Sequence, residues 1–170
     1  LDIVRLGQRG EGLARFEGET MAVPYALPGE KIRAEIDGER AKLVDVITPS
    51  ADRIPAFCPH FTLCGGCAVQ TLAKPAYEAW KRELVVQALR HAKIETDVAP
   101  LIDAHGEGRR RATFHARVID EGASRKTLEL GFMQARAHKI VSIPDCPILD
   151  PALKGAMEAA RAAATVLIPL

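Results

Sequence analysis

The positions of four cysteines restrict the folds open to this 170-residue chain more than any other feature of its sequence. Cys58, Cys64 and Cys67 lie close together, and Cys146 follows after another 78 residues. A site built from all four would fix a short loop to a distant segment. The spacing is compatible with two disulfides, with a zinc site or with an iron–sulfur cluster.

Disulfides are the first alternative for these cysteines. They need an oxidising compartment, and residues 1–5 show neither the basic nor the apolar region of a signal peptide. We therefore expect a cytoplasmic protein. In such a protein a Cys-x-x-Cys pair, here Cys64 and Cys67, more often binds metal or performs redox chemistry.

Zinc and iron–sulfur are the two metal alternatives. Structural zinc sites usually combine two closely spaced pairs, and here there is one, with His60 as a possible replacement ligand. An iron–sulfur cluster is favoured because proline directly follows both Cys58 and Cys146. Gly65 and Gly66 would let the backbone approach a bulky cluster and direct N–H groups at its sulfurs. The residues favour iron–sulfur and leave zinc and disulfides open.

The first fifty residues have the pattern of a small β domain. Short segments rich in Val, Ile and Leu alternate with turn residues, among them Asp37-Gly38. Five such strands predict a small closed barrel of the OB-like size, followed by a linker at residues 48–52. The predicted strands are Asp2–Leu6, Gly12–Phe16, Thr20–Val23, Glu30–Ile36 and Ala41–Ile47.

The remaining residues predict a mixture of helices and strands. Apolar residues at helical spacing predict a helix from Pro75 to about His91, with Glu78 and Arg82 as an ion pair on its outer side. Asp150, followed by a proline, predicts the start of a second helix. The strands predicted between these helices begin near Arg109 and at Leu128–Phe132 and Lys139–Ile143.

A run of basic residues is the second candidate functional feature. Residues 109–117 contain four arginines and no acid, and basic and apolar side chains alternate along residues 111–118. In a strand this period of two gathers the basic side chains on one face, which suits RNA phosphates. A solvated face whose arginines pair with acids such as Glu129 is the alternative. The predicted RNA-binding residues are Arg109, Arg111, His115 and Arg117.

Composition excludes some classes of protein. Apolar residues make up 48% and charged residues 26% of the chain, as in globular proteins. No apolar run approaches the roughly 18 residues of a membrane span. The net charge of +1 does not indicate a globally basic nucleic-acid binder, and the predicted barrel itself has an excess of acidic residues.

The two cysteine segments resemble those of a known family. Residues 58–70, CPHFTLCGGCAVQ, and residues 143–149, IPDCPIL, are similar to the cluster-binding segments of bacterial RNA uracil-5-methyltransferases. Residues 7–12, 23–24 and 27–30 are similar to the TRAM domain of that family, a small RNA-binding barrel. The resemblance implies a [4Fe–4S] cluster held by Cys58, Cys64, Cys67 and Cys146. It favours the ribosomal RNA enzymes of the family over the transfer RNA enzyme.

The resemblance also implies a domain organisation. We expect an α+β, mostly β chain with a five-stranded TRAM-like barrel at residues 1–52. Residues 53–170 would form an iron–sulfur-containing central domain that is incomplete. The expected partners are ribosomal RNA and the protein's own catalytic domain, with no membrane and no second copy of the chain.

Catalytic residues are not predicted within this chain. Uracil-5 methylation needs a thiolate that adds to C6 and a base that removes the C5 proton. The family carries both, with the S-adenosylmethionine site, in a C-terminal Rossmann-like domain, and the chain is expected to end before it. Residues 106–108 are only half of a Gly-rich cofactor loop. The rival hypothesis is a self-contained zinc-bearing RNA-binding module with no catalytic activity.

Overall fold

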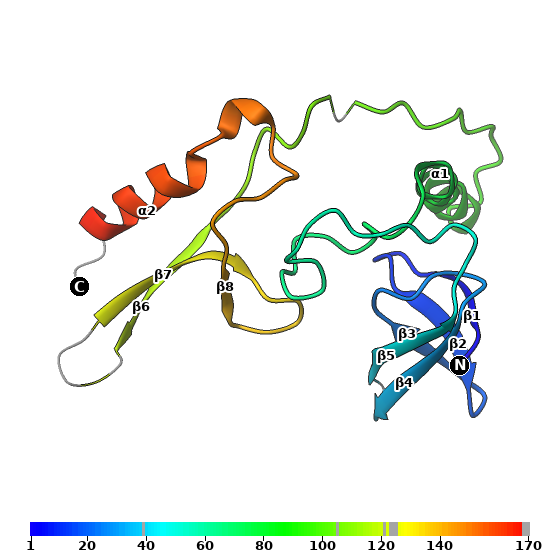
Figure 1. Cartoon of the computed structure of the whole chain (residues 1–170). Coiled ribbons are helices and arrows are strands. Elements are labelled where there is room, and N and C mark those ends of the chain that lie inside the picture. Colours follow the sequence, from blue (N-terminus) through cyan, green and yellow to red (C-terminus); the bar gives the residue numbers. More distant parts are fainter. Residues whose placement is uncertain (39, 105, 121, 123–125, 168–170) are drawn as a thin grey trace. The chain divides into compact units, whose positions relative to one another are not determined.

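A computed structural model describes residues 1–38, 40–104, 106–120, 122 and 126–167 (Figure 1). Their Cα positions divide into two compact units. The first unit, called the strand unit below, comprises Leu1–Ala56 and Ala68–Ile102. The second, called the cysteine unit, comprises Phe57–Cys67 and the chain from Asp103 onward. The described residues are mostly β and form three small antiparallel sheets and two α-helices.

The five predicted N-terminal strands are confirmed in position. They belong to two sheets, one of order β1-β2-β3 and one formed by β4 and β5. The alternation of apolar and charged residues in β4 puts Ile32 in the core and leaves Lys31 and Arg33 exposed. The strands are β1 Ile3–Leu6, β2 Gly12–Phe16, β3 Glu19–Val23, β4 Lys31–Asp37 and β5 Arg40–Thr48.

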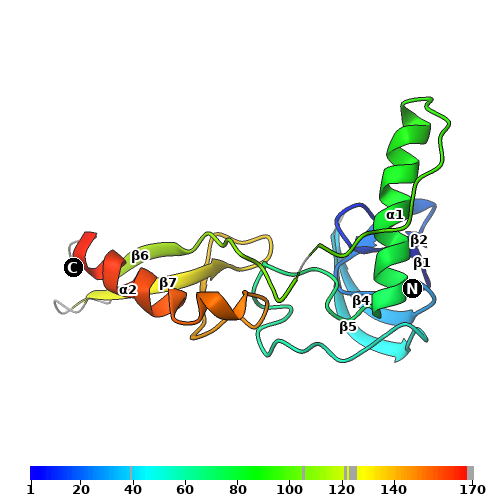
Figure 2. The same cartoon turned by 90° about the horizontal axis from the view of Figure 1, so that it is seen from above.

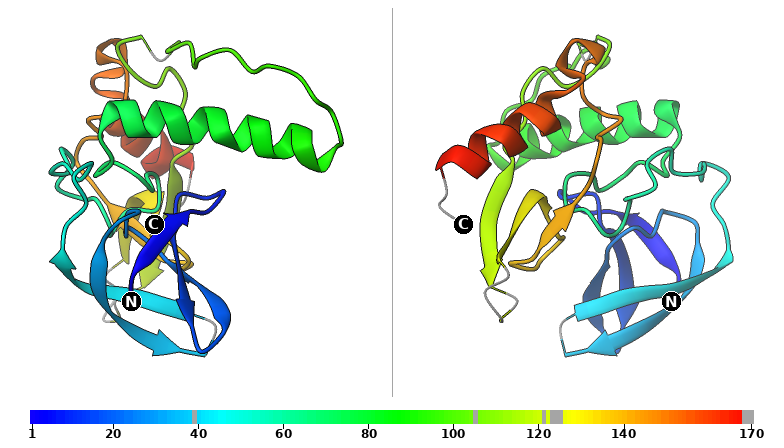
Figure 3. Two further views of the ribbon diagram at one scale, coloured as in Figure 1. Left: turned by 90° about the vertical axis from the view of Figure 1, so that its right-hand side faces the viewer. Right: turned by 60° about the vertical axis from the view of Figure 1, so that its left-hand side comes forward.

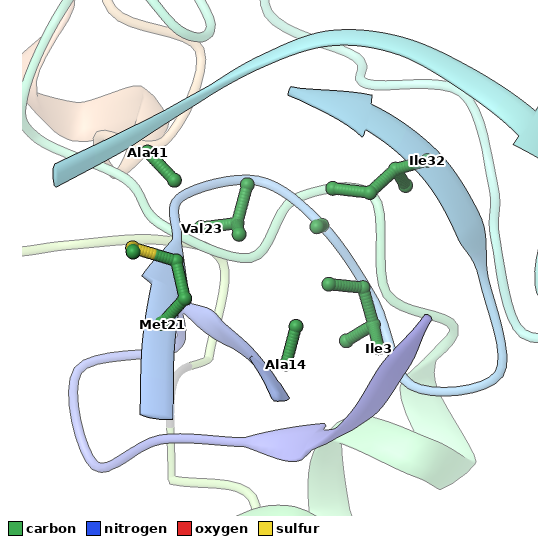
Figure 4. Close-up of a cluster of buried hydrophobic side chains, with 7 residues drawn as sticks. Ile3, Ala14, Met21, Val23, Ile32 and Ala41 are labelled. Carbon is green, nitrogen blue, oxygen red and sulfur yellow. The ribbon is translucent and has the colours of Figure 1, made fainter. Parts of the chain in front are cut away.

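One apolar core lies between these two sheets (Figure 4). Val23 is fully buried, and the other core side chains are at most 6% exposed. Both sheets contribute, so the sheets are joined by side-chain packing as well as by the chain. The labelled core residues are Ile3, Ala14, Met21, Val23, Ile32 and Ala41.

The predicted closed barrel is not confirmed. Near the chain start, the N–H of Ile3 donates to the carbonyl of Glu30 at 2.9 Å, and the N–H of Ile32 donates to the carbonyl of Leu1 at 2.8 Å. Beyond this short connection, no β-ladder links the two sheets within the described residues. Strand β1 has only four residues and a register shift after Ile3, so it offers little backbone for continuous pairing with β4.

A buried ion pair fixes the loop between β3 and β4. The Glu30 carboxylate is 1% exposed and accepts the N–H of Leu27 at 2.8 Å and that of Ser50 at 3.3 Å. Arg53 donates to it through Nε and, at 2.9 Å, through Nη2. The same Nη2 also donates to the carbonyl of Tyr25 at 2.8 Å. Burial raises the pKa of Glu30, but the hydrogen bonds from Arg53 and the backbone outweigh it and hold the pKa below its ordinary value.

Helix α1, Lys74–His91, is confirmed within one residue of its predicted start (Figure 3). The indole N–H of Trp80 donates to the carbonyl of Gly7 at 3.2 Å, so the helix belongs to the strand unit. The spatial division of the chain therefore differs from the sequence boundary predicted after residue 52. The predicted Glu78–Arg82 pair is wrong, because Glu78 pairs with Lys74 at 3.8 Å and Arg82 donates to the carbonyl of Val98 at 2.8 Å.

The cysteine unit contains the third sheet. Strands β6 His115–Asp120, β7 Lys126–Met133 and β8 Ile140–Ser142 pair antiparallel in that order. Helix α2, Ala156–Leu167, lies along β7, and Arg161 donates to the carbonyl of Leu128 at 3.4 Å (Figure 2). The core between sheet and helix consists of Leu130, Val141, Ile143, Met157 and Ala164.

The predicted start of the second helix needs a correction. Asp150 does accept a backbone N–H, that of Ala152 at 2.9 Å, but the turn it caps is the short 3-10 helix η1, Pro151–Leu153. Gly155 follows with φ +86° and separates η1 from α2. A left-handed residue cannot continue a right-handed helix, so α2 begins at Ala156. No helix in the described part of the chain is long and apolar enough to span a bilayer.

Candidate metal-binding cysteines and basic surface

All four cysteines lie in the cysteine unit. Cys58, Cys64 and Cys67 belong to the loop 57–67, and Cys146 lies in the segment that follows β8. Each is half-buried, and no disulfide joins any two of them. The fold therefore brings the two cysteine-bearing segments, which are far apart in sequence, into the same compact unit.

Tight turns hold the cysteine loop in shape. The carbonyl of His60 accepts the N–H of Cys64 at 2.9 Å and that of Leu63 at 3.2 Å. The carbonyl of Cys58 accepts the N–H of Phe61 at 3.1 Å. Thr62, at φ +74°, has the left-handed backbone conformation that this reversal requires. His60 thus contributes its backbone to the loop.

Gly65 docks the cysteine loop on the end of β7. Its N–H donates to the carbonyl of Met133 at 2.9 Å, and the neighbouring Cys64 forms a β-bridge with Gln134. A Cβ atom at residue 65 would lie 2.9 Å from the Met133 carbonyl oxygen and 3.0 Å from the nitrogen of Ala135. Only glycine allows so close an approach of the two backbones. The loop is thereby fixed to the third sheet.

Gly66 directs its backbone N–H at a cysteine sulfur. It donates to Sγ of Cys64 at 3.4 Å. The approach of Gly65 and Gly66 to a cluster stays a prediction.

Cys146 is the cysteine most affected by its surroundings. It packs at the edge of the apolar core of the cysteine unit. Burial raises its pKa, and the charges of Cys67, Cys58 and Asp145 raise it further, although a hydrogen bond from the backbone of Ile148 opposes them. The pKa of Cys146 therefore responds to the charges of two other cysteines, Cys67 and Cys58.

The two metal alternatives require different spacings of the donor atoms. A zinc ion holds each sulfur at about 2.3 Å in a tetrahedron, so its ligand sulfurs lie only about 4 Å apart. Among the described residues, no group of three or more His, Cys, Asp or Glu is arranged to hold a metal ion. A four-iron cluster binds each thiolate at a different iron and requires a wider set of sulfurs.

The prediction of one basic strand face is wrong for residues 109–114, which precede the strand. Strand β6 begins only at His115, because Arg109 pairs with Leu149 in a parallel bridge next to the Cys146 segment. The N–H of Arg109 donates to the carbonyl of Ile148 at 2.8 Å. Arg111 is exposed and precedes the strand. The alternating residues 109–114 therefore do not share a sheet face with the rest.

The second half of the predicted face lies in β6. His115 is half-buried opposite Gly131 of β7. Arg117 is cross-strand from Glu129 and forms an ion pair with it at 3.1 Å, so this arginine follows the alternative of pairing with an acid. Its Nη1 also donates to the carbonyl of His138 at 3.4 Å.

One group of exposed basic residues, in the turn between β7 and β8, was not predicted from the sequence. Arg136, His138 and Lys139 are all exposed in the turn between β7 and β8. The signal was present in the sequence, because residues 134–139 contain these three side chains and no acid. These residues were not predicted as functional, because nothing in the local sequence indicates that the cysteine loop docks beside this turn.

Comparison with known proteins adds relatives of this chain. A protein of Caulobacter vibrioides named uncharacterized RNA methyltransferase is 41% identical over 94% of this chain and 38% of its own length. The 23S rRNA (uracil(1939)-C(5))-methyltransferases RlmD of Methylococcus capsulatus and Halomonas elongata are each 39% identical, over 85% and 95% of this chain and 34% of their own lengths. The chain spans less than two fifths of the length of these three relatives. No family model matches it.

Proposed function

Because the chain belongs to the family of bacterial RNA methyltransferases that includes the 23S rRNA uracil-C5-methyltransferases, we propose that it is the RNA-recognition and iron–sulfur part of an S-adenosylmethionine-dependent RNA uracil-5-methyltransferase. One observation carries the proposal. The similarity to these enzymes covers 94% of the chain in one case and 95% in another, so it includes both the strand unit and the cysteine unit. The proposed substrate is ribosomal RNA.

Within this proposal the chain recognises RNA and supports the reaction. Methylation at C5 of uracil needs a nucleophilic thiolate and a general base. We assign all four cysteines of residues 1–170 to the cluster, so we assign neither catalytic group to this chain. S-adenosylmethionine would be bound outside residues 1–170.

We assign the [4Fe–4S] cluster to Cys58, Cys64, Cys67 and Cys146. One observation supports these ligands: all four thiols belong to one compact unit. When bound, the cluster would cross-link the cysteine loop to the segment after β8. The rival zinc-bearing module without catalytic activity is not favoured, because the relatives are RNA methyltransferases.

RNA contacts are proposed in both units. The strand unit would act as the TRAM-like RNA-binding domain. In the cysteine unit, Arg109 and Arg111 are exposed, and no ion pair with a described acid neutralises them. Guanidinium groups bind phosphate oxygens through two parallel hydrogen bonds, which suits these arginines for RNA phosphates. His115 and Arg117 stay candidates, although Arg117 would have to exchange Glu129 for a phosphate.

The cluster assignment is tested on protein purified without oxygen. We expect a brown solution with about four iron and four sulfide per chain, the composition of such a cluster. The same measurement on Cys146→Ala should show most of the iron lost. A colourless protein with one zinc per chain would favour the rival module.

The methyltransferase assignment is tested in cells. Deleting the gene in its source organism should remove one 5-methyluridine from ribosomal RNA, as measured by nuclease digestion and mass spectrometry. Restoring the gene should restore the modification. Unchanged 5-methyluridine in all ribosomal RNA of the deletion strain would contradict the proposed substrate.

A direct RNA-binding measurement tests Arg111. Filter binding of a uridine-rich oligonucleotide across a salt series should give a log–log slope of about −0.7 per phosphate contacted. Arg111→Ala should flatten that slope by about one contact and weaken binding to all sequences equally, because phosphates carry no base identity. Lys154, an exposed lysine of the same unit, provides the control, and Lys154→Ala should bind as the unmodified chain does. Equal slopes for both variants would mean that Arg111 is only solvated.

A further inference from the structure

The turn at residues 134–139, called the basic turn below, joins β7 to β8. The N–H of Gln134 donates to the carbonyl of Lys139 at 2.8 Å, and the N–H of Ala137 donates to that of Gln134 at 3.3 Å. Arg136 has φ +57°, a conformation that non-glycine residues seldom adopt. The turn is thus a closed, defined structure that exposes Arg136, His138 and Lys139.

The basic turn is fastened to the cysteine loop on one side. The hydrogen bond from Gly65 ends at Met133, directly before the turn, and Cys64 bridges to Gln134, its first residue. The proposed cluster ligand Cys64 and the basic turn therefore share one backbone connection. A shift of the cysteine loop would move the turn or break this connection.

Arg117 fastens the other side of the basic turn. Its Nη1 donates to the carbonyl of His138, while its Nε donates to Glu129 at 3.1 Å. The Glu129 carboxylate thus holds the side chain of Arg117 in place. No ion pair with a described acid neutralises Arg136 or Lys139 in the structure. Their charges are available to a partner.

We propose that the basic turn binds RNA phosphates through Arg136 and Lys139, and that the docked cysteine loop keeps it in the binding conformation. This inference rests on the proposed function, because it takes the partner to be RNA and the cysteines to hold a cluster. A rigid backbone presenting two unneutralised cations fits a polyanion whose charges repeat along a chain. The exposed Arg111 in the same unit extends the positive charge available to such a partner.

The charges are tested by filter binding of the same oligonucleotide to the full chain. Arg136→Ala and Lys139→Ala should each lower the affinity about fivefold in 0.1 M salt and flatten the salt slope by about 0.7. The double variant should lose about 25-fold. Lys154→Ala, which removes an exposed lysine outside the turn, is the matched control and should change nothing.

The docking is tested with Gly65→Ala, which keeps every cation and every cysteine. Its Cβ cannot lie 2.9 Å from the Met133 carbonyl, so the loop must shift. We expect RNA affinity to fall toward that of the double variant, with circular dichroism showing the fold retained. Removing iron from the unmodified chain with a chelator should have the same effect on RNA binding.

The outcomes separate this inference from the proposed function. If the unmodified chain does not bind RNA at all, the proposed function fails. If it binds RNA but Arg136→Ala and Lys139→Ala bind equally well, the basic turn is not an RNA contact. RNA binding by Gly65→Ala at the unmodified affinity would overturn the role of docking. Displacement of RNA by polyglutamate as effective as by unlabelled RNA would instead indicate an acidic protein partner.

Discussion

The strand unit and the cysteine unit are stabilised in different ways. In the strand unit, short neighbouring strands pack their apolar faces together, and the buried carboxylate of Glu30 binds the backbone N–H groups of Leu27 and Ser50 and the side chain of Arg53. The cysteine unit assembles segments that are distant in sequence, the loop 57–67, the third sheet and the turn of Cys146. The stability of the strand unit therefore depends on its own packing, whereas that of the cysteine unit depends on how its cysteine loop is fixed.

The largest expected effect is that of Cys146→Ala on the cysteine unit. If the four thiols bind one cluster, the substitution opens a cross-link across 78 residues, worth about 4–5 kcal/mol in the chain-entropy model developed for disulfides. Hydrogen exchange should show lost protection in β6, β7 and β8 and unchanged protection in β1 to β5. After iron is chelated from both proteins, their stabilities should agree within about 1 kcal/mol. Equal protection in the iron-loaded proteins would show that Cys146 is not a ligand.

Glu30→Ala should produce the reverse pattern. It leaves Arg53, whose side chain is 21% exposed, without its buried partner and should cost about 3 kcal/mol of unfolding free energy. The loss should appear in β1 to β5 and leave β6 to β8 unchanged by hydrogen exchange. Arg33→Ala is the matched control. It breaks the pair of Arg33 with Asp45, whose side chains are 66% and 55% exposed, and should cost less than about 1 kcal/mol.

Gly131→Ala should weaken the cysteine unit without touching a cysteine. A Cβ at this residue of β7 would lie 1.9 Å from the carbonyl oxygen of Val141, so β8 has to move away. We expect about 2 kcal/mol of destabilisation, the usual range for overpacking, measured by urea denaturation. Gly7→Ala, whose added Cβ would meet only the flexible side chain of Glu11, tests whether the effect depends on the close approach to another backbone. Similar losses of unfolding free energy in both variants would show that the close approach to Val141 is not the cause.

The smallest expected effect is that of low pH on the stability of the strand unit. The pKa of Glu30 is lower in the folded chain than its ordinary value of about 4.5, so its contribution to stability is complete above that value and is lost as the pH falls through the folded-state pKa. The midpoint of thermal unfolding of the strand unit should therefore fall below about pH 4.5. Glu30→Gln should show a shallower fall over the same range. An identical pH profile in the variant would assign the acid sensitivity to other carboxylates.

Local sequence patterns predicted most of the secondary structure. The strands of the first unit and helix α1 are marked by turn residues, by alternation and by Pro75, which act within a few residues. Closure of a barrel depends instead on pairing between strands distant in sequence, and no local pattern reports it. Nor does a local pattern report the contact of Trp80 with Gly7, which joins helix α1 to the strand unit.

The candidate site was predictable in its residues more than in its geometry. The cysteine spacing identifies four candidate ligands, and the fold places them in one unit. The alternation at Arg109 and Arg111 indicated a strand, but this backbone pairs with the Cys146 segment instead. The backbone contact of Gly65 with Met133 was not predicted, and its approach to a cluster stays a prediction. Each difference comes from a long-range contact that competes with a local preference.

The docking of the cysteine loop on β7 also imposes an order on biosynthesis. Cys58, Cys64 and Cys67 are translated well before Met133, the residue that receives Gly65, and before Cys146. At roughly 5–20 residues per second, the interval between Cys67 and Cys146 lasts roughly 4–16 s. During that interval the nascent chain has three thiols with neither their sheet nor the fourth cysteine. A site made from all four cysteines can be completed only after Cys146 has left the ribosome. Until then, oxidants and other metal ions can react with the first three thiols.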